Sequence, residues 1–187
     1  MIRMDLNEKI RRVPDFPKKG IEFYDITTVL QDAEAFRETV DGMAEAIRQV
    51  PCDVIVGLES RGFLFAAPVA YALGKSLVLV RKQGKLPYKT ISASYDLEYG
   101  SDCFEVHEDA IQKGQNVVIV DDLLASGGTS EATADLVNRM GGVVTAMVYF
   151  IELEELKGRE KLSCPVVTSL VKLWEYDLHD KTTLVKG

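Results

Sequence analysis

Two adjacent aspartates followed by a run of very small residues form the segment of this chain with the clearest chemical potential. The run Val117–Ser130 (VVIVDDLLASGGTS) begins with β-branched residues that predict a buried strand, and it then reaches Asp121 and Asp122. The loop that follows has little side-chain bulk, so its amides can approach a phosphate closely, and its glycines permit positive φ angles. A helix expected to start near Thr129 or Ser130 adds N–H donors and a partial positive charge. The segment therefore predicts a phosphate cradle.

The two carboxylates distinguish this segment from ordinary phosphate loops. The sequence here is neither G-x-x-x-x-G-K-[ST] nor G-x-G-x-x-G, which excludes a Walker site and a dinucleotide fingerprint. Asp121 and Asp122 would repel a phosphate unless they faced another group. Vicinal ribose hydroxyls are one such group, since a carboxylate accepts two strong hydrogen bonds from a diol. A hydrated Mg²⁺ carried by the same sugar phosphate is another.

Short β-branched runs predict the strands that must position this loop. They are Asp53–Leu58, Ser76–Val80, Asn116–Val120, Val143–Ile151 and Val166–Val171. Their nearly continuous apolar character suits strands that are covered on both faces, as in a parallel sheet.

Helical spacing of apolar residues appears between these runs. It predicts a first helix that is capped by Asp32 and runs through Ile47. A second helix is expected over Phe65–Leu73, with Pro68 in its first turn. A third is expected over Ser130–Met140 and ends at Gly141-Gly142. Alternating strands and helices imply right-handed crossovers, hence an α/β fold with a central parallel sheet flanked by helices. Ligands of such sheets bind at the carboxyl ends of the strands, where the cradle would lie.

Two segments depart from this alternation. The first ~30 residues contain Pro14, Pro17 and Gly20, and they predict a helix plus an irregular extended segment. Gln83–Gly100 is polar without a clear apolar period, which is typical of a functional loop, whereas Cys103–His107 alternates like a half-exposed strand. We expect one domain over residues 1–187, with a lid loop at about 82–100.

Composition excludes several classes of protein. A net charge of −7 argues against a nucleic-acid-binding surface. The three cysteines form no CxxC pair, which argues against a zinc knuckle or a redox motif. The longest apolar stretches fall short of the ~20 residues that span a bilayer, and the N-terminus lacks the apolar run of a signal peptide. We expect a cytoplasmic protein.

The run Val117–Ser130 resembles the phosphoribosyl pyrophosphate (PRPP) signature of the type I phosphoribosyltransferase family. Further segments, in order from about Asp15 to Leu162, are similar to the adenine-specific members of that family. They are DFPKKGIEFYDIT (Asp15–Thr27), GLESRGFLF (Gly57–Phe65), VRKQGKLP (Val80–Pro87), ASYDLEYG (Ala93–Gly100) and KGREKL (Lys157–Leu162).

The resemblance implies a type I phosphoribosyltransferase fold with an N-terminal hood at about residues 1–31 and a flexible catalytic loop at about 82–100. It also implies purine salvage: adenine and PRPP become AMP and diphosphate. Mg²⁺ is expected to enter with PRPP and to be held mainly by PRPP itself, with no direct protein metal site; Asp121 and Asp122 are the protein groups that could lie near it. The family further implies a homodimer.

The same resemblance assigns roles to individual residues. PRPP or AMP is expected at Asp121, Asp122, Ala125, Ser126, Gly127, Gly128 and Thr129, where Ser126 replaces the threonine usual in the adenine-specific members. Diphosphate is expected at Ser60, Arg61, Arg81, Lys82, Lys85 and Tyr99. An arginine can grip diphosphate bidentately, and all these basic residues follow predicted strands.

The resemblance places proton management and base recognition elsewhere. Glu98 is the candidate general acid/base for the purine ring, with a pKa that lid closure would have to raise. Adenine is expected at Glu22, Phe23 and Tyr24, where Phe23 would stack on the purine. Tyr24 stands where the family commonly has arginine, and both aromatic residues could instead belong to the core.

Two alternatives stay open on the sequence. A sister enzyme acting on a 6-oxo purine would need a donor such as lysine at O6, and the sequence places no lysine over the base. A non-catalytic regulator that senses PRPP would carry a DNA-binding domain or a basic surface, and this acidic chain shows neither.

Overall fold

The computed structural model describes residues 4–97 and 100–174. By its internal contacts the chain forms two compact units, Met1–Gly42 and Met43–Gly187, and each is described by itself. No helix within the described ranges is both long and apolar enough to cross a membrane.

The first unit contains a small hairpin. A 3₁₀ turn, Asn7–Lys9, precedes strand β1 (Arg11–Val13), which pairs antiparallel with β2 (Phe23–Asp25). Helix α1 (Thr27–Gln31) follows. The expected helix is a 3₁₀ turn, whereas residues 14–22 are irregular as expected. The two short strands on either side of them were not predicted, since cross-strand backbone pairing leaves no mark on the residue pattern of such short strands.

Helix α2 (Ala33–Arg48) begins in the first unit and ends in the second. The predicted cap is confirmed: one Asp32 carboxylate oxygen accepts hydrogen bonds from the amides of Glu34 (3.0 Å) and Ala35 (3.1 Å). These bonds satisfy donors that the start of a helix leaves unpaired.

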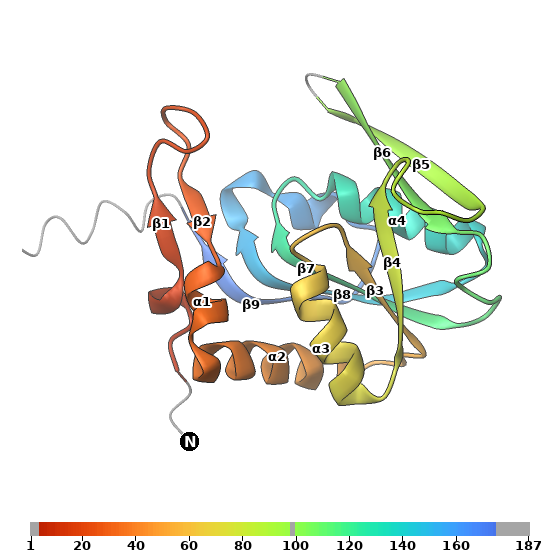
Figure 1. Cartoon of the computed structure of the whole chain (residues 1–187), viewed down its shortest axis with the longest axis horizontal. Coiled ribbons are helices and arrows are strands. Elements are labelled where there is room, and N and C mark those ends of the chain that lie inside the picture. The colour runs from red at the N-terminus through yellow and green to blue at the C-terminus, as the bar shows by residue number, and fades with distance from the viewer. Residues whose placement is uncertain (1–3, 98–99, 175–187) are drawn as a thin grey trace, which may run out of the picture. The chain divides into compact units, whose positions relative to one another are not determined.

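The second unit is built on a seven-stranded sheet in the order β5-β6-β4-β3-β7-β8-β9 (Figure 1). Its strands are β3 (Val54–Leu58), β4 (Ser76–Lys82), β5 (Thr90–Leu97), β6 (Gly100–His107), β7 (Asn116–Leu124), β8 (Val143–Leu153) and β9 (Val167–Leu173). The strands from β4 to β9 in this order run parallel, whereas β6 pairs antiparallel with both of its neighbours, β4 and β5. All five predicted strands are confirmed, and the mixed sheet refines the parallel one that we expected.

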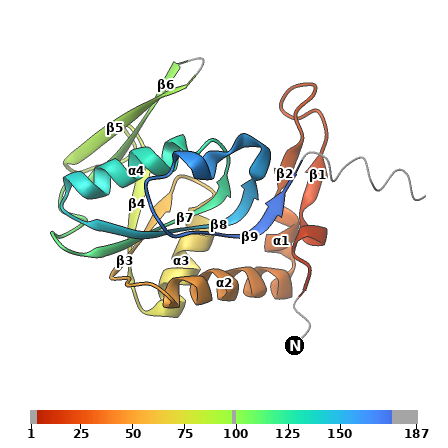
Figure 2. The ribbon, with the colours of Figure 1, turned by 180° about the vertical axis from the view of Figure 1, so that it is seen from behind.

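The central strands form the core. Val56, Ile119 and Met147 are aligned across β3, β7 and β8 and have no exposed surface. Helices α3 (Phe63–Leu73) and α4 (Gly128–Arg139) cover opposite faces of the sheet (Figures 1 and 2). The sheet therefore has the two-sided cover that its apolar strands predicted.

The helix ends agree in part with the sequence. The predicted close of α4 is confirmed: Gly141 has a φ of +85°, and the Gly142 amide donates to the Val137 carbonyl at 3.0 Å. The placement of Pro68 in a first turn is wrong, because α3 begins at Phe63 and Pro68 lies inside it. There Pro68 has no N–H to donate back along the helix.

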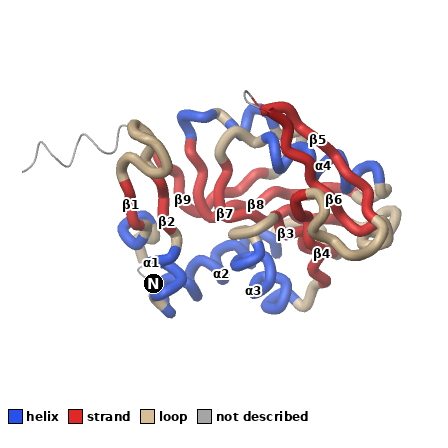
Figure 3. The backbone as a smooth tube through the Cα atoms, turned by 45° about the horizontal axis from the view of Figure 1, so that its top comes forward, coloured by secondary structure: helices blue, strands red, loops and turns tan. Residues whose placement is uncertain are grey.

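The segment predicted as a loop at about 82–100 contains a strand. β5 pairs with β6 along its whole length, from Thr90 opposite His107 to Leu97 opposite Gly100 (Figure 3). Ile91 and Ala93 on β5 pack against the core, and this weak alternation of small apolar residues is the only local sign of the strand. The prediction of an irregular segment was wrong for this half of it.

Candidate active site

A small pocket lies at the carboxyl end of β7, where the sequence predicted a phosphate cradle. It encloses about 70 Å³ and is lined by Asp121 and by residues 123–130. All five predicted loop residues, Ala125 to Thr129, belong to this lining. Gly127 has a φ of +82°, and α4 begins directly after it, so the helix N-terminus faces the loop. This geometry suits an anion.

The two aspartates have different surroundings. β7 continues to Leu124, so Asp121 and Asp122 lie inside the strand and project to opposite faces. Asp121 lines the pocket, whereas Asp122 is 5% exposed and its Oδ2 lies 2.8 Å from Nε of Arg61. The sequence treated the pair as equivalent, and the strand separates them.

Burial dominates the electrostatics of this pair. Desolvation and the neighbouring Asp122 carboxylate raise the pKa of Asp121 well above its ordinary value. Desolvation also raises the pKa of Asp122, while the Arg61 guanidinium opposes the rise. Asp122 already has the Arg61 guanidinium as its partner, whereas the raised pKa of Asp121 means that hydrogen-bond donors or positive charge at the pocket, such as a ribose diol or a cation would supply, would favour its charged form.

The loop after β3 reaches the same edge of the sheet because β3 pairs in parallel with β7. Gly62 lies against Asp121: a Cβ at this position would be 2.6 Å from Oδ1 of Asp121 and from the Leu58 carbonyl oxygen. Only a glycine allows this approach, which carries Arg61 to Asp122. Ser60 lies in the same loop, and its carbonyl accepts the Phe63 amide at 3.2 Å.

The strand β4 is the other neighbour of β3, and it continues two residues beyond the predicted end, so Arg81 and Lys82 form its last positions and Lys85 follows it. Glu59 organises them: its Oε1 lies 2.9 Å from Nη2 of Arg81, and its Oε2 accepts the Lys82 amide at 2.8 Å. The hydrogen bond from Arg81 holds the pKa of Glu59 below its ordinary value. A second bond from Arg81 reaches the carbonyl of Lys85 at 3.2 Å. The structure thus brings Arg61, Arg81, Lys82 and Lys85 to adjacent strand ends.

The sequence analysis did not single out Glu105. This buried side chain on β6 accepts hydrogen bonds from the amides of Lys85 (3.0 Å) and Leu86 (2.9 Å) and from the Thr90 hydroxyl (3.3 Å). Burial opposes the charge, but the backbone donors prevail and lower the pKa of Glu105. Glu105 lies between Phe104 and Val106, which belong to the core, so alternation places it on the other face of β6 and the residue pattern gave no sign of its burial.

Two predicted residues, Glu98 and Tyr99, lie outside the described residues. Strands β5 and β6 lead to them from either side.

The residues predicted to bind adenine lie in the first unit. Oε2 of Glu22 is 3.6 Å from Nη1 of Arg12, and the Phe23 ring meets Phe16 edge to face at 5.1 Å between centroids. Tyr24 is 7% exposed, and the Arg12 guanidinium lies 5.7 Å from its ring centroid. A guanidinium from the opposite strand therefore packs on the residue that replaces the family's arginine.

Within the described ranges, no cluster of three or more His, Cys, Asp or Glu is placed to hold a metal ion. The carboxylates of Asp121 and Asp122 are oxygen donors of the kind that Mg²⁺ prefers, yet Asp122 is already paired with Arg61. The pair fits an ion that arrives with a phosphate ligand better than one held by protein alone.

A family model described as a phosphoribosyl transferase domain matches residues 27–179. The chain belongs to this family. An adenine phosphoribosyltransferase of Acetivibrio thermocellus is 59% identical to this phosphoribosyltransferase over 170 residues, which cover 90% of this chain and 99% of the relative.

Solved structures agree. The adenine phosphoribosyltransferase of Thermoanaerobacter pseudethanolicus superposes with a TM-score of 0.88 at 51% identity, covering 90% of this chain and 98% of that one. The Saccharomyces cerevisiae enzyme was solved with an imino-altritol bisphosphate and adenine. It superposes with a TM-score of 0.83 at 42% identity, covering 89% of this chain and 96% of that one. The expected type I fold is confirmed.

Proposed function

We propose that this phosphoribosyltransferase joins adenine to PRPP and releases AMP and diphosphate, as a purine salvage enzyme. The observation that carries the proposal is the pocket over Asp121–Ser130, in a chain that is 59% identical to an adenine phosphoribosyltransferase.

The residues around the pocket divide between the two ends of PRPP. The loop Ala125–Thr129 and the N-terminus of α4 bind the 5′-phosphate, because the backbone there offers donors without bulk. Asp121, which lines this pocket, accepts hydrogen bonds from the ribose hydroxyls, with Asp122 beside it.

The diphosphate end meets the basic residues. Diphosphate is held by Ser60, Arg61, Arg81, Lys82, Lys85 and Tyr99. Arg61 and Arg81 are already paired with Asp122 and Glu59, so diphosphate competes for guanidinium groups whose positions are fixed.

The reaction breaks the bond from C1 of ribose to diphosphate as a purine nitrogen forms the new bond. Positive charge develops on the ribose ring, near the Asp121 carboxylate, and negative charge on the leaving diphosphate, near the basic residues. Mg²⁺ bound to PRPP would neutralise part of that negative charge, held mainly by PRPP oxygens and water near Asp121 and Asp122.

Glu98 is proposed to exchange a proton with the purine ring, and Tyr99 to assist at the diphosphate. The Glu98→Gln variant should lower kcat more than it weakens PRPP binding, since an amide keeps the shape but cannot exchange the proton. Steady-state kinetics and calorimetry measure both quantities. An unchanged kcat would remove Glu98 from the mechanism.

Base recognition is assigned to Gly20–Thr27, with Phe23 stacking on adenine and groups at Glu22 and Tyr24 close by. The Phe23→Ala variant should raise the KM for adenine more than that for PRPP. Equal changes in both would contradict this assignment.

We further propose a homodimer that works in the cytoplasm. The outer surfaces of α3 and β4 expose large apolar side chains, among them Leu64, Tyr71, Leu77 and Leu79, and Tyr71 is 90% exposed. A second copy of the chain would cover this face. The three cysteines are free, which suits a reducing compartment. Light scattering on Tyr71→Glu should show a monomer where the parent protein shows a dimer.

The decisive assay supplies PRPP, Mg²⁺ and each purine in turn. Conversion of adenine to AMP, with hypoxanthine, guanine and xanthine inert, is the expected result. Turnover of hypoxanthine without adenine would contradict the proposal. Tight PRPP binding without turnover of any base would instead identify a sensor of PRPP.

A further inference from the structure

The pocket loop rests on a second piece of backbone, the turn Lys157–Ser163. A Cβ added to Gly127 would lie 2.6 Å from the Gly158 carbonyl oxygen. A Cβ added to Gly158 would overlap the Ala125 carbonyl oxygen and lie 3.1 Å from the Gly127 amide nitrogen. The two backbones are thus in contact with no room for a side chain between them. Any shift of the turn must move the loop.

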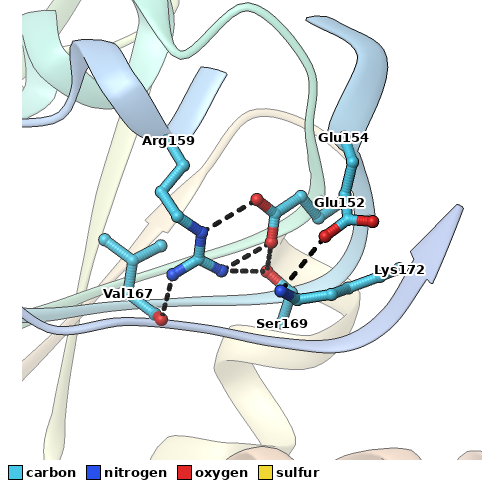
Figure 4. Close-up of polar contacts among 6 residues, drawn as sticks. All are labelled: Glu152, Glu154, Arg159, Val167, Ser169 and Lys172. Atoms are coloured by element: carbon cyan, nitrogen blue, oxygen red, sulfur yellow. Dashed lines mark hydrogen bonds and ion pairs between the residues drawn. The ribbon is translucent and has the colours of Figure 1, made fainter. Parts of the chain in front are cut away.

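Arg159 fixes this turn to the sheet (Figure 4). Its Nε donates to Oε1 of Glu152 at 2.9 Å, and its Nη2 donates to Oε2 of the same carboxylate. Its Nη1 donates to the carbonyl of Val167 on β9. The Ser169 hydroxyl, also on β9, donates to Oε2 of Glu152 at 2.7 Å. One guanidinium therefore joins the turn to both β8 and β9.

The pair stays charged at neutral pH. The hydrogen bonds from Arg159 hold the pKa of Glu152 below its ordinary value, and those bonds raise the pKa of Arg159. Glu152 is only 4% exposed. The planar guanidinium binds both oxygens of this buried carboxylate, so it fixes the orientation of the two groups as well as the distance between them. A lysine ammonium cannot reproduce this two-point contact.

The other end of the turn is tied to α4. The Ser163 amide donates to Oε2 of Glu131 at 3.0 Å, and Glu131 lies in the first turn of that helix. The turn is therefore held between the sheet and the helix whose N-terminus faces the pocket.

We infer that Arg159 and Glu152 are positioning residues for the 5′-phosphate: their ion pair holds Gly158 as the outer wall of the phosphate loop. The inference rests on the proposed function, because it takes the pocket to be the 5′-phosphate site. It predicts that loosening the pair weakens binding of the 5′-phosphate and leaves binding of diphosphate unchanged.

The test measures two ligands separately by calorimetry on the purified protein: ribose 5-phosphate for the pocket, and diphosphate with Mg²⁺ for the basic residues. Arg159→Lys keeps the charge and removes the fork, and Ser169→Ala removes one hydrogen bond as a milder change. The matched control is Lys172→Ala: Lys172 lies on β9, like Ser169, and its removal breaks a neighbouring ion pair with Glu154 (3.2 Å) (Figure 4).

For Arg159→Lys we expect about a tenfold loss of affinity for ribose 5-phosphate, the loss for one hydrogen bond to a charged group, and a smaller loss for Ser169→Ala. Diphosphate affinity should stay within about twofold in both variants, and Lys172→Ala should match the parent for both ligands. Parent-like ribose 5-phosphate affinity in folded Arg159→Lys and Ser169→Ala would overturn the inference, as would equal losses for the two ligands. A parent protein that binds no ribose 5-phosphate would instead contradict the proposed function itself.

Discussion

The loop proposed to bind the 5′-phosphate and the segment proposed to bind diphosphate are built in opposite ways. The loop Ala125–Thr129 carries no charged side chain and is positioned by close backbone contacts, at Gly127 against Gly158 and at the start of α4. The segment Arg81–Lys85 carries three cations, and carboxylates hold it: Glu59 at Arg81 and Lys82, and Glu105 at Lys85.

This difference determines which changes should weaken ligand binding at each region. A cradle of backbone amides depends on shape, so a single methyl group in the wrong place should be severe. A cluster of cations depends on charge, so it should tolerate small shape changes and respond to salt and to loss of a carboxylate that holds its backbone. Four predictions test this contrast, from the largest expected effect to the smallest.

The Gly127→Ala variant should weaken PRPP binding at least about 100-fold. The new Cβ would lie 2.6 Å from the Gly158 carbonyl oxygen, and displacing a binding group by 1 Å can lose about that factor. Calorimetric titration with PRPP measures it.

Gly114→Ala is the matched control. Gly114 has a similar φ of +84°, but a Cβ there would meet nothing within 4 Å. The Gly114→Ala variant has the same strain of an alanine at positive φ but no clash. Its melting temperature should therefore fall while its affinity for PRPP is retained. Equal affinities in the two variants would refute a steric cradle.

The Asp121→Asn variant should bind PRPP about 10–100-fold more weakly yet unfold at a higher temperature at pH 8. It loses charged hydrogen bonds to the ribose, each of which contributes about 1.5–3 kcal/mol. It also removes a buried carboxylate whose pKa is raised in the folded state by desolvation and by Asp122.

The sign of the pH dependence follows from that raised pKa. The folded state holds the proton on Asp121 more tightly than the unfolded chain, so its contribution to stability falls as pH rises above the ordinary aspartate value of about 3.9. The gap in melting temperature between Asp121→Asn and the parent should therefore narrow towards pH 4. A gap that widens on acidification would contradict this account.

The Glu105→Gln variant should weaken diphosphate binding about fivefold and leave ribose 5-phosphate binding unchanged. The amide keeps one acceptor oxygen but loses the charge that faces the amides of Lys85 and Leu86, a difference of about 1 kcal/mol. Glu108→Gln, at an exposed position after β6, is the control and should behave like the parent. Parent-like diphosphate affinity in Glu105→Gln would show that the basic segment needs no such support.

The smallest effect should come from salt. Raising NaCl from 50 to 500 mM should lower diphosphate affinity about threefold more than ribose 5-phosphate affinity, because exposed cations such as Lys82 and Lys85 are screened more strongly than backbone donors that line a pocket. Calorimetry at the two salt concentrations gives the ratio. A ratio of one would mean that salt weakens binding of the two ligands equally, which would contradict the contrast between charged side chains and backbone donors.

The regular elements of the second unit followed from local patterns. Continuous apolar runs predicted β3, β4, β7, β8 and β9, because a strand buried on both faces needs such a run. The weak alternation over Thr90–Leu97 did not predict β5, because its pairing with β6 is a backbone interaction that side-chain pattern hardly reports.

The candidate site, like the fold, could be predicted from the sequence only in part. Residue types and order were enough to predict that the small-residue loop and the basic residues lie at one edge of the sheet, since parallel strands bring their carboxyl ends together. Sequence could not separate the roles of Asp121 and Asp122, because their difference depends on a strand that continues two residues beyond them. Nor could it connect Gly158 with Gly127, since a contact between distant backbones has no local signature.

The sequence by itself therefore determined the fold class, the strands of the parallel core and the kind of ligand that the loop after β7 suits. These follow from periodicity and from residue types within short windows. Tertiary structure alone decided which aspartate lines the pocket, which carboxylates hold the basic segment and which turn supports the loop. Each of these depends on residues that are distant in the chain and adjacent in space, where packing and burial set the interaction.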